Sequence, residues 1–206
     1  ERVIQNRKST IQNLSQELLR WGLLWSLSLS APSAFAIGPA SFTTPHDTIP
    51  NFAQTHTIQS MRDGNWSDPG TWDLNRVPNA NDIVAISHTV TYDTTMGIAD
   101  VIGIATGGVL RFRTDVATHL QVGVLLVMPS GVLEVGTAAT PVVATILAEL
   151  IIRNRALGTV TADPDQYGTG LLSIDGTVTM HGAVKTPTFV RVATEPRAGN
   201  TTLTLE

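Results

Sequence analysis

Short runs of alternating apolar and polar residues, each beginning just after a glycine, dominate the second half of the chain. The runs at 108–112, 131–135 and 170–174 each place two apolar residues after the glycine and then alternate, and 176–180 is a shorter relative. Alternation with a period of two predicts β-strands. The one candidate for a helix is the segment 140–153. We therefore expect an all-β domain.

The spacing of these runs predicts repeats that stack in parallel. Val109 and Val132 are 23 residues apart, and Val132 and Leu171 are 39 apart. The first spacing suits one repeat, and the second suits two short repeats or one with an insertion. The expected fold is a single-stranded right-handed parallel β-helix, or β-solenoid, with glycines supplying positive-φ corners. The expected inward ladder consists of Leu110, Phe112, Leu133, Val135, Leu172 and Ile174.

An antiparallel β-sandwich is the alternative architecture, since the same short strands could build it. Asn-Gly hairpin signals are absent, however, and the run 120–128 is almost entirely apolar. A strand that is covered on both faces fits a parallel sheet better.

The N-terminal segment has the pattern of a secretory signal peptide, assigned to residues 1–36. Basic residues precede the apolar run 21–27, and Ala-Phe-Ala at 34–36 offers small residues for cleavage. The run is shorter than the roughly 20 residues that span a bilayer, so a retained anchor is the lesser alternative.

Residues 37–60 are rich in Thr, Pro, Ser and Ala without a sustained period, which predicts a linker or an extended arm. The domain is then expected to occupy 61–206. Because the chain starts at Glu1 instead of Met and stops within a strand-like run at Glu206, we expect a fragment whose domain continues further.

The composition excludes several classes of function. The chain has no cysteine, which excludes a disulfide framework, a thiol nucleophile and a thiolate metal site. Residues 1–36 hold four of the 13 basic and two of the 17 acidic residues, so the remainder has a net charge of −6, which argues against nucleic acid as a partner. We identify no catalytic constellation and no cofactor motif.

A turn-rich segment with two tryptophans precedes the first strands. Trp66 and Trp72 flank Ser-Asp-Pro-Gly-Thr, and Val-Pro at 77–78 leads through Asp82 into the β-forming run 83–86. Two large aromatics beside a proline turn suit a cap over the open end of a parallel stack. We therefore expect a Trp-capped N-terminal end.

With these features, the chain resembles the G-eight domain family, the eight-glycine extracellular module of fibrocystin and of the cell-migration-inducing hyaluronidase. The resemblance covers residues 61–206 in order. The matching segments are 66–72, 77–78, 82–86, 89–93, the Gly-Val-Leu runs and 178–183.

The resemblance implies an extracellular module that binds glycans or other ligands and leads into a longer parallel β-helix. We expect a ligand-binding and structural module of a larger secreted or surface protein, with a polysaccharide or cell-surface glycan as its partner and no membrane span after signal removal. One alternative is the N-terminal part of a hyaluronidase-like or lyase-like glycan depolymerase, with a site completed downstream. Another is a scaffold or adhesion module.

Four side chains are candidates for contacting a glycan. Trp66 and Trp72 could stack on sugar rings through their flat apolar faces, although capping is the favoured role. Arg111 and Arg113 share an outward face and could grip carboxylated glycans through bidentate hydrogen bonds. Solvated arginines that protect a sheet edge are the alternative.

Three further residues could bind a ligand or a metal. His181 could be a ligand or an acid–base group, although no carboxylate lies close to it in the sequence except Asp175. Asp163 and Asp165 open a segment that resembles a Ca²⁺ loop, but the acidic twelfth residue that such a loop needs is absent. A solvated loop is the favoured interpretation.

Overall fold

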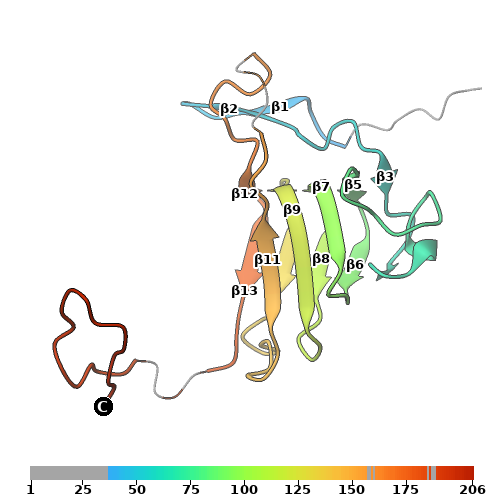
Figure 1. The fold of residues 1–206 in the computed structure, drawn as a ribbon. Helices are drawn as coiled ribbons and strands as arrows, with labels where there is room; N and C mark the ends of the chain where they lie inside the picture. The colour runs from blue at the N-terminus through green and yellow to red at the C-terminus, as the bar shows by residue number, and fades with distance from the viewer. Residues whose placement is uncertain (1–36, 157–158, 160, 185, 187–188) are drawn as a thin grey trace, which may run out of the picture. The chain divides into compact units, whose positions relative to one another are not determined.

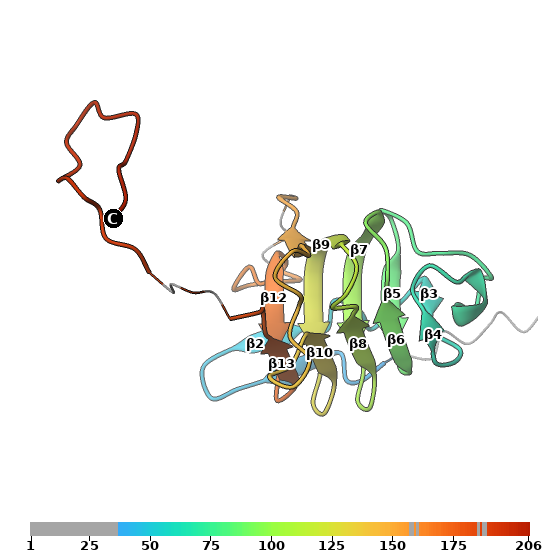
Figure 2. The ribbon, with the colours of Figure 1, turned by 90° about the horizontal axis from the view of Figure 1, so that it is seen from below.

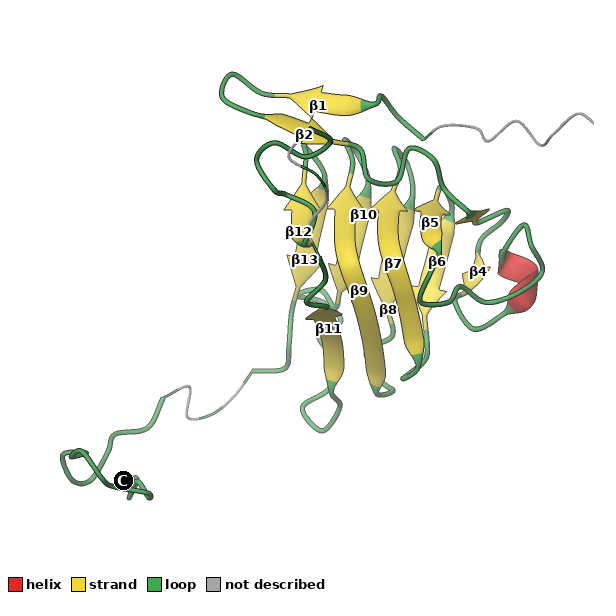
Figure 3. Ribbon diagram, turned by 45° about the horizontal axis from the view of Figure 1, so that its top comes forward, coloured by secondary structure: helices red, strands yellow, loops and turns green. Residues whose placement is uncertain are grey.

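The computed structural model describes residues 37–206 apart from 157–158, 160, 185 and 187–188. Strands make up nearly all of its regular structure, and the short 3₁₀-helix η1 spans Pro69–Thr71 (Figure 3). The strands are β1 (Ser41–Thr43), β2 (Thr48–Pro50), β3 (Ile58–Gln59), β4 (Gly64–Asn65), β5 (Ile83–Ile86), β6 (Thr89–Tyr92), β7 (Gly97–Ile104), β8 (Val109–Phe112), β9 (Thr118–Val127), β10 (Val132–Val135), β11 (Ala148–Ile152), β12 (Gly170–Ser173) and β13 (Thr177–Met180).

The fold is all-β, and the helix considered for 140–153 is wrong. That segment contains loop residues followed by strand β11. Strand β11 pairs in parallel with β9, and Leu150 and Ile152 pack against the main core.

Two parallel sheets contain most of the strands (Figures 1 and 2). The five-stranded sheet has the order β13-β10-β8-β6-β4, and the six-stranded sheet has the order β11-β9-β7-β5-β3. From β3 to β10 the chain alternates between the sheets, so each strand pairs with the strand two positions earlier. Val132 lies beside Val109, which confirms the parallel pairing predicted from their 23-residue spacing.

The main hydrophobic core lies between these two sheets. Leu110, Phe112 and Leu133 are buried in it, as predicted, and Val135 packs against it. Burial of each such side chain contributes about 1.5–3 kcal/mol. The parallel register therefore produces an apolar ladder from strands far apart in the sequence.

Aromatic side chains extend this core towards its β3–β4 end. The ring centroids of Trp66 and Trp72 are 5.0 Å apart in an edge-to-face arrangement. Trp66 also lies 5.2 Å from Tyr92, whose ring is 4.6 Å from that of Phe112. Edge-to-face contacts of this kind are favourable beyond the area they bury, so the aromatic row stabilises the end where the sheets begin.

Strand β12 corrects the predicted ladder, because Leu172 and Ile174 do not follow Leu133. Strand β12 pairs with β9 in the other sheet, where Leu172 lies beside Leu126. Strand β13 takes the place beside β10 and sets Val178 next to Leu133. Strands β11 and β12 both pair with β9, one with its first half and the other with its second half, and a loop separates them. The 39-residue spacing therefore includes both an insertion and a change of sheet.

At two positions, the glycine that opens the run does not supply the predicted positive-φ corner. The positive φ is carried by the preceding residues, with φ of 80° at Gly107 and 62° at Ser130. A Cβ atom at Gly131 would lie 2.8 Å from the carbonyl oxygen of Ile104. Glycine is therefore required at 131 for close backbone approach.

Residues 37–60 were expected to form a linker or an extended arm; the first part of this segment packs on the outer face of the six-stranded sheet, and its end, β3, is a strand of that sheet. Strands β1 and β2 form an antiparallel pair, and Ile37 and Ala53 join a second apolar cluster with Val101 and Val124. The Nδ2 atom of Asn51 donates to two backbone carbonyls of the arm, at 2.6 Å and 2.8 Å. The arm thus covers part of that outer face.

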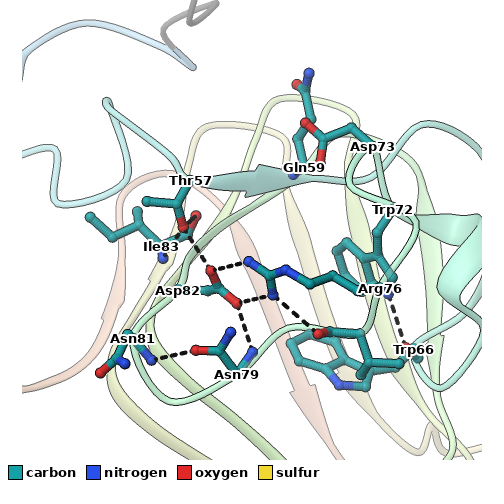
Figure 4. A network of polar contacts seen from close by, with 11 residues as sticks. Thr57, Gln59, Trp66, Trp72, Asp73, Arg76, Asn79, Asn81, Asp82 and Ile83 are labelled. Atoms are coloured by element: carbon teal, nitrogen blue, oxygen red, sulfur yellow. Dashed lines mark hydrogen bonds and ion pairs between the residues drawn. The ribbon is translucent and has the colours of Figure 1, made fainter.

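A partly buried ion pair ties the turn after Trp72 to the start of β5 (Figure 4). The Arg76 guanidinium donates to both oxygens of Asp82, at 2.6 Å and 2.8 Å. Asp82 also accepts from the Asn79 N–H at 2.7 Å and the Thr57 hydroxyl at 3.1 Å. These donors, with Arg76 the largest influence, lower the pKa of the Asp82 carboxyl.

Candidate functional site

Outward side chains of β6, β8 and β10, with residues at the end of β8 and in the loops after β8 and β10, line an open groove of about 460 Å³ on the five-stranded sheet. They point outward because residues facing the core alternate with them along each strand. The groove is lined by Thr91, Arg111, Phe112, Arg113, Thr114, Asp115, Glu134, Thr137 and Thr140. The structure therefore brings both predicted arginines, Arg111 and Arg113, to one surface, which we call the arginine groove.

The first charge pair in the groove joins neighbouring strands. Arg111 on β8 and Glu134 on β10 are register partners, and the Arg111 Nε atom donates to Glu134 Oε1 at 2.7 Å. Within the described residues, neither terminal guanidinium nitrogen of Arg111 forms a hydrogen bond. Those nitrogens remain available as donors to a ligand.

The second charge pair is local. Arg113 donates through Nε and Nη2 to the two oxygens of Asp115, at 2.9 Å and 2.6 Å. These hydrogen bonds lower the pKa of the Asp115 carboxyl and raise the pKa of Arg113. Both groups are therefore charged at neutral pH.

Each arginine of the groove is thus balanced by a carboxylate. The two arginines do not form an uncompensated basic surface, because Glu134 and Asp115 lie within hydrogen-bond distance of the two guanidinium groups. Carboxylate acceptors and guanidinium donors therefore lie side by side in the groove. Such an arrangement can serve ligand hydroxyl groups, which both donate and accept hydrogen bonds.

The two tryptophans lie inside the core, away from any surface that a sugar could reach. Trp66 is 0% and Trp72 1% exposed, and the Trp72 Nε1 atom donates to the Trp66 carbonyl at 3.0 Å (Figure 4). A pyranose needs an open indole face to stack on, so sugar stacking on these two rings has no support in this geometry. Both residues belong to the packing at the β3–β4 end.

His181 lies directly after β13 and is exposed. Its backbone N–H donates to the Val135 carbonyl and its carbonyl accepts from Val142. Its side chain lines a separate depression with Leu147 and Met180. The structure therefore places His181 apart from the arginine groove.

Asp163 and Asp165 lie in the loop between β11 and β12. The buried Asp163 carboxylate accepts from the backbone N–H groups of Tyr167 at 2.9 Å and Gly168 at 2.7 Å, whereas Asp165 is exposed. Asp163 thus closes a turn with both of its oxygens. Within the described ranges, no group of three or more His, Asp or Glu side chains could hold a metal ion.

The sequence did not single out a polar cluster on the other sheet. His119 Nδ1 lies 2.9 Å from Glu149 Oε2, and Gln121 Nε2 lies 3.0 Å from His119 Nε2. His119 and Glu149 are register partners on β9 and β11. Alternation could have placed His119 and Gln121 on one outward face, but the assignment of 140–153 as a candidate helix hid Glu149.

Comparison with known proteins identifies a family for more than half of the chain. The family model described as the G8 domain matches residues 71–193. No curated protein and no solved structure matches the chain. In the part of the chain that the structure describes, we find no helix with the length and hydropathy needed to cross a membrane.

Proposed function

Because the chain belongs to the G8 domain family, a family of extracellular domains, we propose that it is a ligand-binding and structural module of a secreted or surface protein, with a polysaccharide as its ligand. The signal-peptide pattern of residues 1–36, which lie outside the described residues, supports export. The arginine groove supports the choice of ligand.

We propose in addition that the module is a right-handed parallel β-helix capped by its tryptophans. Alternation of the chain between two parallel sheets supports this description, since each pair of successive strands then makes one repeat. Right-handed connection of parallel strands is the overwhelming preference in proteins. The burial of Trp66 and Trp72 beside the first strands supports a capping role.

The observation that carries the functional proposal is the pairing of Arg111 with Glu134 in the groove. One carboxylate and one guanidinium side by side can accept from one sugar hydroxyl and donate to the next. The threonines of the rim add further hydroxyl groups. Because the charges are balanced, the groove favours a neutral polysaccharide over a carboxylated one.

A panel of immobilised neutral, carboxylated and sulfated polysaccharides tests this proposal. We expect the protein to retain neutral polysaccharide best, and Arg111→Gln and Glu134→Gln each to weaken that binding by about tenfold, because each removes a charged hydrogen-bonding partner. Retention should also change little with salt, since few counterions are displaced from a neutral glycan.

Arg62→Gln is the matched control, because Arg62 also forms an exposed ion pair, with Asp68 at 3.1 Å, but does not line the groove. This variant should bind as the unmodified protein does. Equal binding by Arg111→Gln and the unmodified protein, with unfolding temperatures unchanged, would contradict the proposal. So would the absence of binding to every polysaccharide tested.

A further inference from the structure

A second depression, of about 510 Å³, lies on the outer face of the six-stranded sheet, beside the part that the arm covers. Strands β7, β9 and β11 and their preceding loops form it. It is lined by Thr95, Met96, Gly97, Ile98, Ala117, Thr118, His119, Gln121, Leu147 and Glu149. This pocket shares none of its residues with the arginine groove.

Two oxygen atoms of the pocket can still accept hydrogen bonds. A carboxylate can only accept, so the His119 Nδ1 atom must carry the proton that is shared with Glu149 Oε2. The His119 Nε2 atom then accepts from the Gln121 amide nitrogen. The second oxygen of Glu149 and the amide oxygen of Gln121 are left, and both are acceptors.

With His119 neutral, the pocket carries the negative charge of Glu149. The two arginines that follow β11 are engaged elsewhere: Arg155 pairs with Asp100 at 2.6 Å, and Arg153 donates to two backbone carbonyls. Neither forms an ion pair with Glu149 in the described structure. A ligand that brings donors and a positive charge therefore complements this pocket.

Part of the pocket lining is apolar. Met96 and Leu147 are 86% and 61% exposed, and Ile98 also lines the pocket. A pyranose presents an aliphatic C–H face that can cover such side chains and a polar edge that can reach Glu149. We propose that the pocket binds a primary ammonium group carried by a pyranose ring, which is the chemistry of an amino sugar in a deacetylated glycan. This proposal rests on the proposed function only in taking the ligand to be a saccharide.

Isothermal titration with three probes tests the assignment: an oligomer of glucosamine, its fully N-acetylated counterpart, and the ring-free diamine cadaverine. We expect the glucosamine oligomer to bind at least about tenfold more tightly than either of the others, because only it offers both the ammonium group and the ring. Glu149→Gln preserves the shape of the side chain and removes its charge. It should weaken binding of the glucosamine oligomer by at least about tenfold.

Asp165→Asn makes the same change of charge in an exposed loop residue and should leave the affinity unchanged, which controls for general attraction to an acidic protein. Equal affinity of Glu149→Gln and the unmodified protein, at matched unfolding temperatures, would overturn the site. Equal affinity for the acetylated oligomer would overturn the ammonium assignment, and equal affinity for cadaverine would overturn the sugar. If neutral glycans bind through Arg111 while glucosamine oligomers do not bind, only the present inference fails.

Discussion

The two partners of the Arg76–Asp82 ion pair differ in what their loss should cost. The Asp82 side chain is 6% exposed, whereas that of Arg76 is 40% exposed. Arg76→Met leaves a buried carboxylate with only the Asn79 N–H and Thr57 hydroxyl as donors, so we expect the free energy of unfolding to fall by about 3–5 kcal/mol at pH 7. Asp82→Asn leaves a guanidinium that can turn towards water, so we expect a smaller loss of about 1–2 kcal/mol.

The pH dependence gives a second test of the same reasoning. Hydrogen bonds from Arg76, the largest cause, lower the pKa of Asp82 in the folded state, below its unfolded value of about 3.9. The pair therefore stabilises the protein above that value, and its contribution is lost as the pH falls through the folded-state pKa. Arg76→Met removes the largest cause of the lowered pKa of Asp82, so the deficit of Arg76→Met should shrink as the pH falls through the unfolded value of about 3.9.

Urea denaturation at several pH values, followed by tryptophan fluorescence, measures both effects because Trp66 and Trp72 lie in the adjoining core. For a domain of this size, the expected loss in Arg76→Met corresponds to a decrease of roughly 6–20 °C in the unfolding temperature. A cost of Asp82→Asn equal to or above that of Arg76→Met would refute the reasoning. A deficit of Arg76→Met that stays constant as the pH falls from 7 to below about 3.9 would also refute it.

Three other predictions concern the core and the turns. Gly131→Ala should destabilise the protein by about 1–3 kcal/mol, because the added Cβ atom would overlap with a carbonyl of β7. Ser130→Gly should stabilise it by up to about 1 kcal/mol, because glycine adopts the positive φ of this position without strain. Thermal unfolding compares the two variants, and equal effects on stability would contradict this account. Leu110→Ala should cost about 2–5 kcal/mol because Leu110 is fully buried, and a loss below about 1 kcal/mol by urea titration would show that the residue is not in a packed core. Burial is the main cause of the raised pKa of Tyr92, so the stability of the protein should fall as the pH rises above about 10. Tyr92→Phe loses the 2.6 Å hydrogen bond to the His119 carbonyl and should remove that part of the alkaline loss of stability. An unchanged alkaline stability profile in this variant would contradict the prediction.

The sequence predicted which side of each strand faces the core more reliably than which strands are neighbours. Leu110 and Leu133 could be paired in advance because alternation marks them as inward and a constant spacing connects them. Leu172 has the same local pattern, but the loop before it lets the chain re-enter the other sheet. Local periodicity reports the direction of a side chain, whereas the length and path of a loop decide which strand it joins.

The same distinction explains which parts of the candidate sites could be predicted. Arg111 and Glu134 are 23 residues apart, the spacing that pairs Val109 with Val132, so applying the apolar repeat to polar positions would have predicted their ion pair. His119 and Glu149 are register partners at a separation of 30 residues, because the loop after β10 (136–147) is longer than the loop after β8 (113–117). No single repeat length covers both pairs, and the second could not be derived from the first.

The chemistry of the outer faces therefore depends on turn length more than the core does. An inward ladder needs only an apolar residue at each position, so a register shift by one side-chain period of about two residues leaves it intact. A polar site needs particular partners opposite each other, such as Glu134 beside Arg111 or Glu149 beside His119, and the same shift separates them. Because the turns at 128–131 and 136–147 set these two registers independently, the two surfaces can differ in ligand while the core between them keeps one apolar pattern.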